Sequence, residues 1–106
     1  MTDPIRRLRK ICLSLPDAVE TENFGHPFFR IKGKPFCIYG GTAEVKTISF
    51  KVAKSEQGIF LEDARFFKTP YIGQHGWVSL RVSGPLDWEE IEELVRGGYR
   101  LAAPRR

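Results

Sequence analysis

Residues 28–39 read FFRIKGKPFCIY, two short runs rich in aromatic and β-branched residues on either side of a Gly-Lys pair. Alternating polarity with period two is typical of strands, and a short gap between two such runs is typical of a hairpin. The stretch therefore predicts antiparallel strands at about 28–32 and 35–39, joined by a turn at Gly33-Lys34.

The same period continues on both sides of this hairpin. Further strands are expected at about 19–24, 46–52 and 77–82, with residues 63–76 forming mostly loop. Strands that follow one another through short turns form an antiparallel sheet. The sequence therefore predicts an antiparallel sheet of about five strands.

Helical periodicity appears at both ends of the chain. Asp3-Pro4 is a helix-start signal, and the pattern after it predicts a helix at about 4–14. A short helix is expected at 55–61, and a last helix runs from Asp87 to about Arg96. Because both terminal helices are amphipathic, we expect them to pack on one face of the sheet in an α+β fold.

Length and composition limit the classes of protein. The 106 residues, 42% hydrophobic and 28% charged, fit a single domain covering 1–106. No apolar run approaches the roughly 20 residues of a membrane span, and the N-terminus lacks a signal-type core, so we expect a cytoplasmic protein with no membrane partner. Cys12 and Cys37 are expected to be reduced, partly buried thiols.

Charge is unevenly distributed along the chain. The net charge is +4, and residues 30–81 hold nine basic against four acidic residues, a local excess of +5. Such an excess favours an acidic partner. Five acids then gather in residues 87–93, where they match the positive end of the last helix dipole, and a metal-binding cluster is the alternative.

Strand alternation divides the side chains between the two faces of the sheet. The apolar sets around Phe29, Phe50 and Val78 are expected to point inward. The opposite face then carries three outward sets, which are Phe28, Arg30 and Lys32; Thr47, Ser49 and Lys51; and Trp77, Ser79 and Arg81. Every charge in these sets is positive.

An open face that combines cations with aromatic rings suits nucleic acid, because cations attract phosphates and rings stack on bases. The leading hypothesis is a non-enzymatic DNA-binding protein. Its phosphate contacts are predicted at Arg30, Lys32, Lys34, Lys51 and Arg81, and its stacking or wedge contact at Trp77. An ordinary solvated sheet face is the competing interpretation.

Catalytic and cofactor motifs are not found. The histidines, His26 and His75, both lie in predicted turns, and no phosphate-binding loop, zinc signature or nucleophile elbow occurs. We therefore expect no catalytic residue, cofactor or metal. Two alternatives stay open: a protein-interaction module that uses the same face, and a small-ligand or enzymatic site near His26, His75 and Tyr71.

Several short motifs in order also identify a family resemblance. They are Leu15-Pro16-Asp17 with Glu20, the stretches 24–30, 33–37 and 49–51, Pro70-Tyr71, Gly76-Trp77-Val78, and Tyr99-Arg100-Leu101-Ala102. With them the chain resembles the MmcQ/YjbR family. The resemblance implies a frataxin-like (CyaY-like) fold and DNA binding through hairpin wings and a basic surface. Frataxin-type iron binding is disfavoured, because the first helix is basic here.

Overall fold

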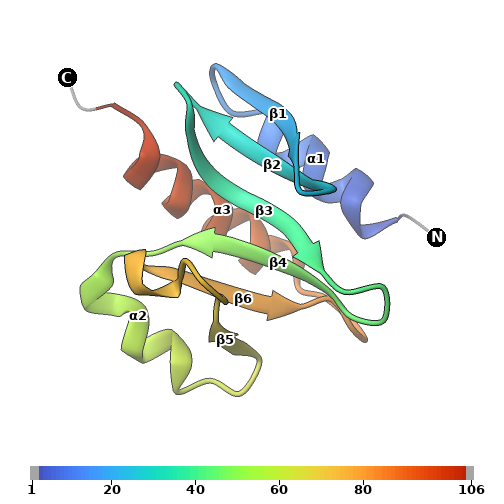
Figure 1. Cartoon of the computed structure of the whole chain (residues 1–106), viewed down its shortest axis with the longest axis vertical. Helices are drawn as coiled ribbons and strands as arrows, with labels where there is room; N and C mark the ends of the chain where they lie inside the picture. The colour runs from blue at the N-terminus through green and yellow to red at the C-terminus, as the bar shows by residue number, and fades with distance from the viewer. Residues whose placement is uncertain (1–2, 105–106) are drawn as a thin grey trace.

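A sheet with the two terminal helices behind it makes up most of the computed structural model, which describes residues 3–104 (Figure 1). The helices are α1 (Pro4–Leu13), α2 (Lys54–Leu61), the short 3-10 helix η1 (Gly73–His75) and α3 (Trp88–Ala102). The strands are β1 (Ala18–Asn23), β2 (His26–Ile31), β3 (Lys34–Gly41), β4 (Lys46–Lys51), β5 (Phe66–Lys68) and β6 (Trp77–Arg81). The predicted α+β class is confirmed.

The sheet has six strands in the order β1-β2-β3-β4-β6-β5, and every neighbouring pair is antiparallel. The prediction of about five strands is therefore wrong by one. The additional strand, β5, has three residues and lies inside the stretch 63–76 that was expected to be loop. An edge strand of three residues is too short to show a periodicity of its own, so only its pairing with β6 identifies it.

Both N-terminal hairpins close through two-residue turns with left-handed backbone. Phe24 and Gly25 have φ of 55° and 79°, and Lys32 and Gly33 have φ of 50° and 82°. Positive φ at both central residues defines the type I′ turn that fits the twist of a hairpin. The second turn was predicted one residue too late, at Gly33-Lys34, because Lys34 already pairs with Ile31.

The core lies between the sheet and its two terminal helices. Phe29, Phe50 and Val78 are at most 1% exposed, as the predicted inward sets require. From the helices, Leu8 of α1 and Val95 of α3 join the same apolar cluster. Figure 1 shows α1 and α3 on the same side of the sheet, which confirms the predicted layering and leaves the opposite face without a helix over β3 and β4.

Helix α3 continues to Ala102, six residues beyond its predicted end at Arg96. Gly97 and Gly98 caused this error, since adjacent glycines usually weaken a helix. At Gly98 a Cβ atom would lie 2.9 Å from the Phe36 carbonyl oxygen, closer than real Cβ contacts. The glycine therefore allows α3 to lie directly on β3.

Polar contacts fasten the helices to the rest of the molecule. The Arg9 guanidinium donates two hydrogen bonds, of 2.6 and 3.0 Å, to the Glu20 carboxylate and ties α1 to β1. Tyr99 of α3 donates its hydroxyl to the Pro16 carbonyl at 2.6 Å. None of the helices formed by residues 3–104 has both the length and the apolar character needed to cross a bilayer.

Candidate functional site

The face of the sheet opposite α1 and α3 carries a continuous row of side chains across all six strands. Backbone pairing places these residues side by side in the order Thr21, Phe28, Ile38, Ser49, Ser79 and Phe67. Within the row, the two serines lie between Phe28 and Ile38 on one side and Phe67 on the other. No cation belongs to it, so the middle of this face differs from the basic surface that the outward sets predicted.

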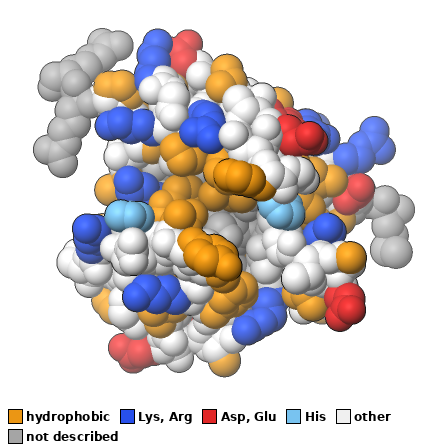
Figure 2. Space-filling model, viewed as in Figure 1, with side chains coloured by type: hydrophobic (Ala, Val, Ile, Leu, Met, Phe, Trp, Pro, Cys, Tyr) orange, Lys and Arg blue, Asp and Glu red, His pale blue; other side chains and the backbone are white. Residues whose placement is uncertain are grey.

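A cleft of about 950 Å³ lies over this row. Apolar groups form most of its walls, with Phe28, Ile38 and Phe67 on strands and Pro70 and Ile72 on the segment before η1. Figure 2 shows a hollow in this face with hydrophobic side chains gathered around it and Lys and Arg farther out. Among the described residues that line the cleft, the ionisable ones are His26, Tyr71 and Arg81, and none is Asp or Glu.

The floor of the cleft is a chain of three hydroxyl groups. Ser79 Oγ hydrogen-bonds with Ser49 Oγ at 2.7 Å and with Thr69 Oγ1 at 2.9 Å. Ser49 and Ser79 are 4% and 1% exposed. Within residues 3–104 these hydroxyls have no hydrogen bond to a histidine or carboxylate side chain, so the geometry gives them no general base.

Two aromatic side chains at the cleft are almost completely exposed. Phe24, in the β1–β2 turn, is 94% exposed, and Tyr71, in the segment before η1, is 97% exposed. Both have left-handed backbone, with φ of 55° and 68°. Bulky side chains rarely occupy this region, and each such residue costs roughly 1–2 kcal/mol. Both rings are therefore held in solvent on a strained backbone, at the edge of the cleft.

The segment 69–76 forms one wall of the cleft and is anchored from both sides. The Val52 amide donates to the Gly76 carbonyl at 2.7 Å. The Gln57 side-chain amide donates to the carbonyls of Gly73 at 2.6 Å and Trp77 at 3.0 Å. This segment passes in front of β6 (Figure 1). A helix-borne glutamine therefore holds the wall that carries Tyr71.

Trp77 does not lie on an open surface. It is 4% exposed, although alternation places it on the same face as Ser79. Residues 69–76 return across the start of β6, and the Thr69 amide donates to the Trp77 carbonyl at 3.4 Å. The expectation that Trp77 presents an exposed ring is therefore wrong, because a loop that sequence periodicity does not place covers this end of the strand.

The predicted cations separate into two groups. Arg30, Lys32, Lys34 and Lys51 lie at the end of the sheet formed by the β2–β3 turn and the end of β4, outside the cleft lining. Arg81 alone of the predicted residues lines the cleft, stacked with its guanidinium 4.6 Å from the Phe67 ring centroid.

These cations also differ in how they are held. The Arg30 guanidinium donates to Thr21, Asn23 and the Gly33 carbonyl at 3.1–3.2 Å and lies over the Phe28 ring. Lys34 is exposed and Lys51 is half-buried. Lys32 is 3.7 Å from an Asp17 carboxylate oxygen. Lysines in and beside the β2–β3 turn therefore lie next to one arginine that several hydrogen bonds hold in place.

The sequence-based hypotheses missed Phe24 as a binding candidate and placed Tyr71 in the small-ligand alternative alone. Phe24 was assigned to a strand, because the residues that favour the first position of a type I′ turn are Asn, Asp and Gly and not Phe. Tyr71 was named only with the histidines. Of that group, His26 and Tyr71 line the cleft, and His75 does not.

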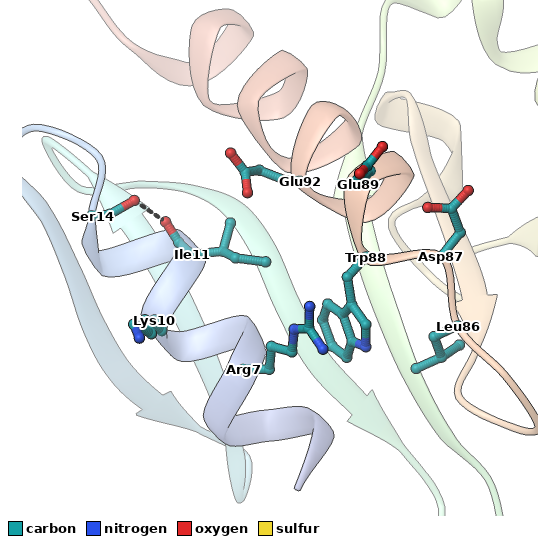
Figure 3. Close-up of a pocket in the computed structure, with 9 residues that line it drawn as sticks. All are labelled: Arg7, Lys10, Ile11, Ser14, Leu86, Asp87, Trp88, Glu89 and Glu92. Carbon is teal, nitrogen blue, oxygen red and sulfur yellow. Dashed lines mark hydrogen bonds between the residues drawn. The ribbon is translucent and has the colours of Figure 1, made fainter. Parts of the chain in front are cut away.

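A second, shallow groove lies between α1 and α3 (Figure 3). Arg7 lies over the Trp88 ring, 5.1 Å from its centroid, and Lys10 shares the groove with Glu89 and Glu92. The groove therefore carries both signs of charge, with two cations and the three acids Asp87, Glu89 and Glu92. Asp87 caps α3 by accepting from the Glu90 amide at 3.2 Å, as the dipole interpretation of the acidic cluster expects.

The two cysteines are buried thiols in the core, each 0% exposed and free of disulfide bonds. Burial, and then a hydrogen bond with Cys37, raises the pKa of the Cys12 thiol. A raised pKa favours the inert neutral form. Over residues 3–104, no group of three or more His, Cys, Asp or Glu side chains is placed to hold a metal ion.

Comparison with known proteins gives one family and several similar structures. The family model described as YjbR matches residues 13–101. A crystal structure of Deinococcus radiodurans protein DR2400, with a DUF419 domain, is 23% identical with a TM-score of 0.79, covering 92% of this chain and 76% of that one. No curated protein matches the chain.

A Pseudomonas syringae protein is also similar in two structures, both 16% identical to this chain. Its crystal structure has a TM-score of 0.75 and covers 96% of this chain and 99% of the other. Its solution NMR structure has a TM-score of 0.72 and covers 95% and 93%. At these identities the likenesses show the shared fold alone.

Proposed function

The chain belongs to the YjbR family, and from that premise we propose that it is a non-enzymatic DNA-binding protein that holds single-stranded DNA over its open sheet face. The observation that carries the proposal is the pair of exposed rings, Phe24 and Tyr71, at a cleft whose described lining includes no acid. Stacking on such rings requires unpaired bases.

Charge supports the same partner. Residues 30–81 carry the local excess of +5 in charge, and this range contains the end of β2 and all of β3, β4, β5 and β6. Arg81 at the cleft is exposed, and Lys51 at the end of β4 is half-buried. A strand that crosses this face would meet Arg81 at the cleft and Lys51, which alternation places on the same face at the far end of β4, with apolar surface between them. Three further predictions accompany this proposal. They are a frataxin-like fold, DNA contacts through hairpin wings, and a cytoplasmic location.

Fluorescence anisotropy of labelled single- and double-stranded DNA over a salt series tests the proposal. We expect tighter binding of the single strand and affinity that falls as salt rises. The double variant Lys51→Glu with Arg81→Glu should weaken binding and reduce the salt slope by about 0.7 for each lost phosphate contact. Arg6→Glu with Lys10→Glu makes the same charge change on exposed positions of α1 and should alter binding much less.

A protein-interaction module is the second candidate, because the same exposed rings and apolar walls can receive a peptide. Its binding would persist in high salt, whereas phosphate contacts weaken there. Equal effects of the two charge-reversed variants, or no DNA binding at low salt, would overturn the DNA proposal.

A further inference from the structure

We propose that the cleft over the open face receives one unstacked base of the bound strand, with the polar edge of the base against the Ser49–Ser79–Thr69 hydroxyl chain. This inference rests on the proposed function and adds to it a specific pocket and its occupant. It is carried by the shape of the cleft, by the free hydrogen-bonding capacity of its floor and by the placement of charge around it.

Shape is the first argument. The cleft volume of about 950 Å³ is within the range of about 300–1,000 Å³ typical of small-molecule sites. Phe28, Ile38 and Phe67 offer apolar surface, and Phe24 and Tyr71 stand at the edge. A flat ring fits such walls, because its faces are apolar and its polar atoms lie on its rim.

The floor supplies the second argument. Each hydroxyl has one hydrogen to donate and two lone pairs to accept with. The chain from Ser49 through Ser79 to Thr69 contains two hydrogen bonds, so one hydrogen and several lone pairs stay available. Thr47, 9% exposed, adds another hydroxyl to the lining. Mixed donors and acceptors match the edge of a base, which also presents both.

Charge placement is the third argument. A buried phosphate needs cations around it, and the hydroxyl floor has none. Arg81 is exposed and lines the cleft, with its guanidinium held over Phe67. This arrangement places an uncharged ring inside and its phosphate outside, next to a cation, which is the order of groups in a nucleotide.

The strained rings are the fourth argument. Phe24 and Tyr71 bury almost nothing and both need left-handed backbone. Asparagine or glycine would suit these positions better for folding alone. Rings kept there despite this cost are suited to stack on the bases next to the one in the cleft.

The test compares two oligonucleotides of about ten nucleotides: oligothymidylate and an abasic strand with the same phosphates. The wild-type protein should bind the intact strand at least about tenfold more tightly. Gly40→Leu should lower this ratio to the part that stacking on Phe24 and Tyr71 supplies and leave the abasic affinity unchanged. A Cβ atom at Gly40 lies in ordinary contact, 3.9 Å from atoms of His26, Ile38 and Thr47, so the longer side chain extends over the floor without displacing backbone.

Two further variants keep the test independent of that one substitution. Tyr71→Ala should lower the intact-to-abasic ratio about tenfold, and Ser49→Ala should change the preference between thymine and adenine strands. Gly58→Leu is the matched control, because Gly58 lies on α2, has open space around its Cβ position and is outside the cleft lining. Urea unfolding of each variant confirms that it is folded.

The outcomes separate the two proposals. Equal wild-type affinity for the intact and abasic strands, with steep salt dependence, would overturn the base pocket and leave DNA binding in place. Lower discrimination in Gly40→Leu but not in Gly58→Leu supports the pocket. No binding of either strand at low salt would overturn both proposals.

Discussion

Ser49 Oγ and Ser79 Oγ lie 2.7 Å apart and join the neighbouring strands β4 and β6 by a side-chain hydrogen bond beneath the cleft. Ser79 also hydrogen-bonds with Thr69, which leads into the segment that carries Tyr71. Stability of the sheet and position of the cleft wall therefore depend on the same hydroxyl group.

Removing the central hydroxyl should destabilise the fold more than removing a terminal one. Ser79→Ala leaves both Ser49 and Thr69 without this partner, and we expect a loss of about 1–3 kcal/mol. Ser49→Ala leaves the Ser79–Thr69 bond intact and should cost less. Urea unfolding measures both, with the exposed Ser83→Ala as control. Equal losses of stability in the two variants would show that the three hydroxyl groups do not act as a connected unit.

Replacing an exposed ring should stabilise the protein while it weakens binding. Phe24→Asn creates an Asn-Gly type I′ turn and should raise the free energy of unfolding by up to about 1 kcal/mol. The same variant should lose affinity for single-stranded DNA. Lys32→Asn in the other type I′ turn is the stability comparison. A clear loss of stability in Phe24→Asn alone would mean that its ring packs on the fold.

Adjacent glycines of α3 should respond in opposite directions to alanine. Gly98→Ala places a Cβ atom 2.9 Å from the Phe36 carbonyl oxygen and should cost about 1–3 kcal/mol. Gly97→Ala has no atom within 4 Å of the new Cβ and should stabilise the helix by about 0.5–1 kcal/mol. Thermal unfolding of the pair checks this. The same sign for both would contradict close packing of α3 on β3.

Alkaline pH should destabilise the protein through Cys12. Burial raises the pKa of its thiol above the unfolded value of about 8.5, so only the unfolded chain ionises as pH rises past that value. The neutral Cys12 thiol makes its full contribution to the free energy of unfolding below pH about 8.5. Above that pH, the contribution falls by about 1.4 kcal/mol per pH unit. Urea midpoints against pH should fall more steeply for the wild type than for Cys12→Ala. Identical slopes would show that the thiol is accessible.

Whether a sequence prediction was correct depended on how far apart along the chain the interacting residues lie. Periodicity places Phe29, Phe50 and Val78 in the core correctly, because alternation is a local property of a strand. The predictions of open surface were less accurate. Trp77 is covered by residues 69–76, and β5 exists only through its pairing with β6. Both depend on where a loop returns in space, which no local pattern contains.

The sequence by itself therefore determined the α+β class, the inward apolar sets, the hairpin of residues 28–39 and the resemblance to the family, since each rests on neighbouring residues or on motif order. Only the tertiary structure decided that Ser49, Thr69 and Ser79 meet beneath a cleft and that Phe24 and Tyr71 stand beside it. These residues come from four separate segments. Antiparallel pairing and a loop anchored by Gln57 bring them together, and such long-range contacts form only when the whole chain folds.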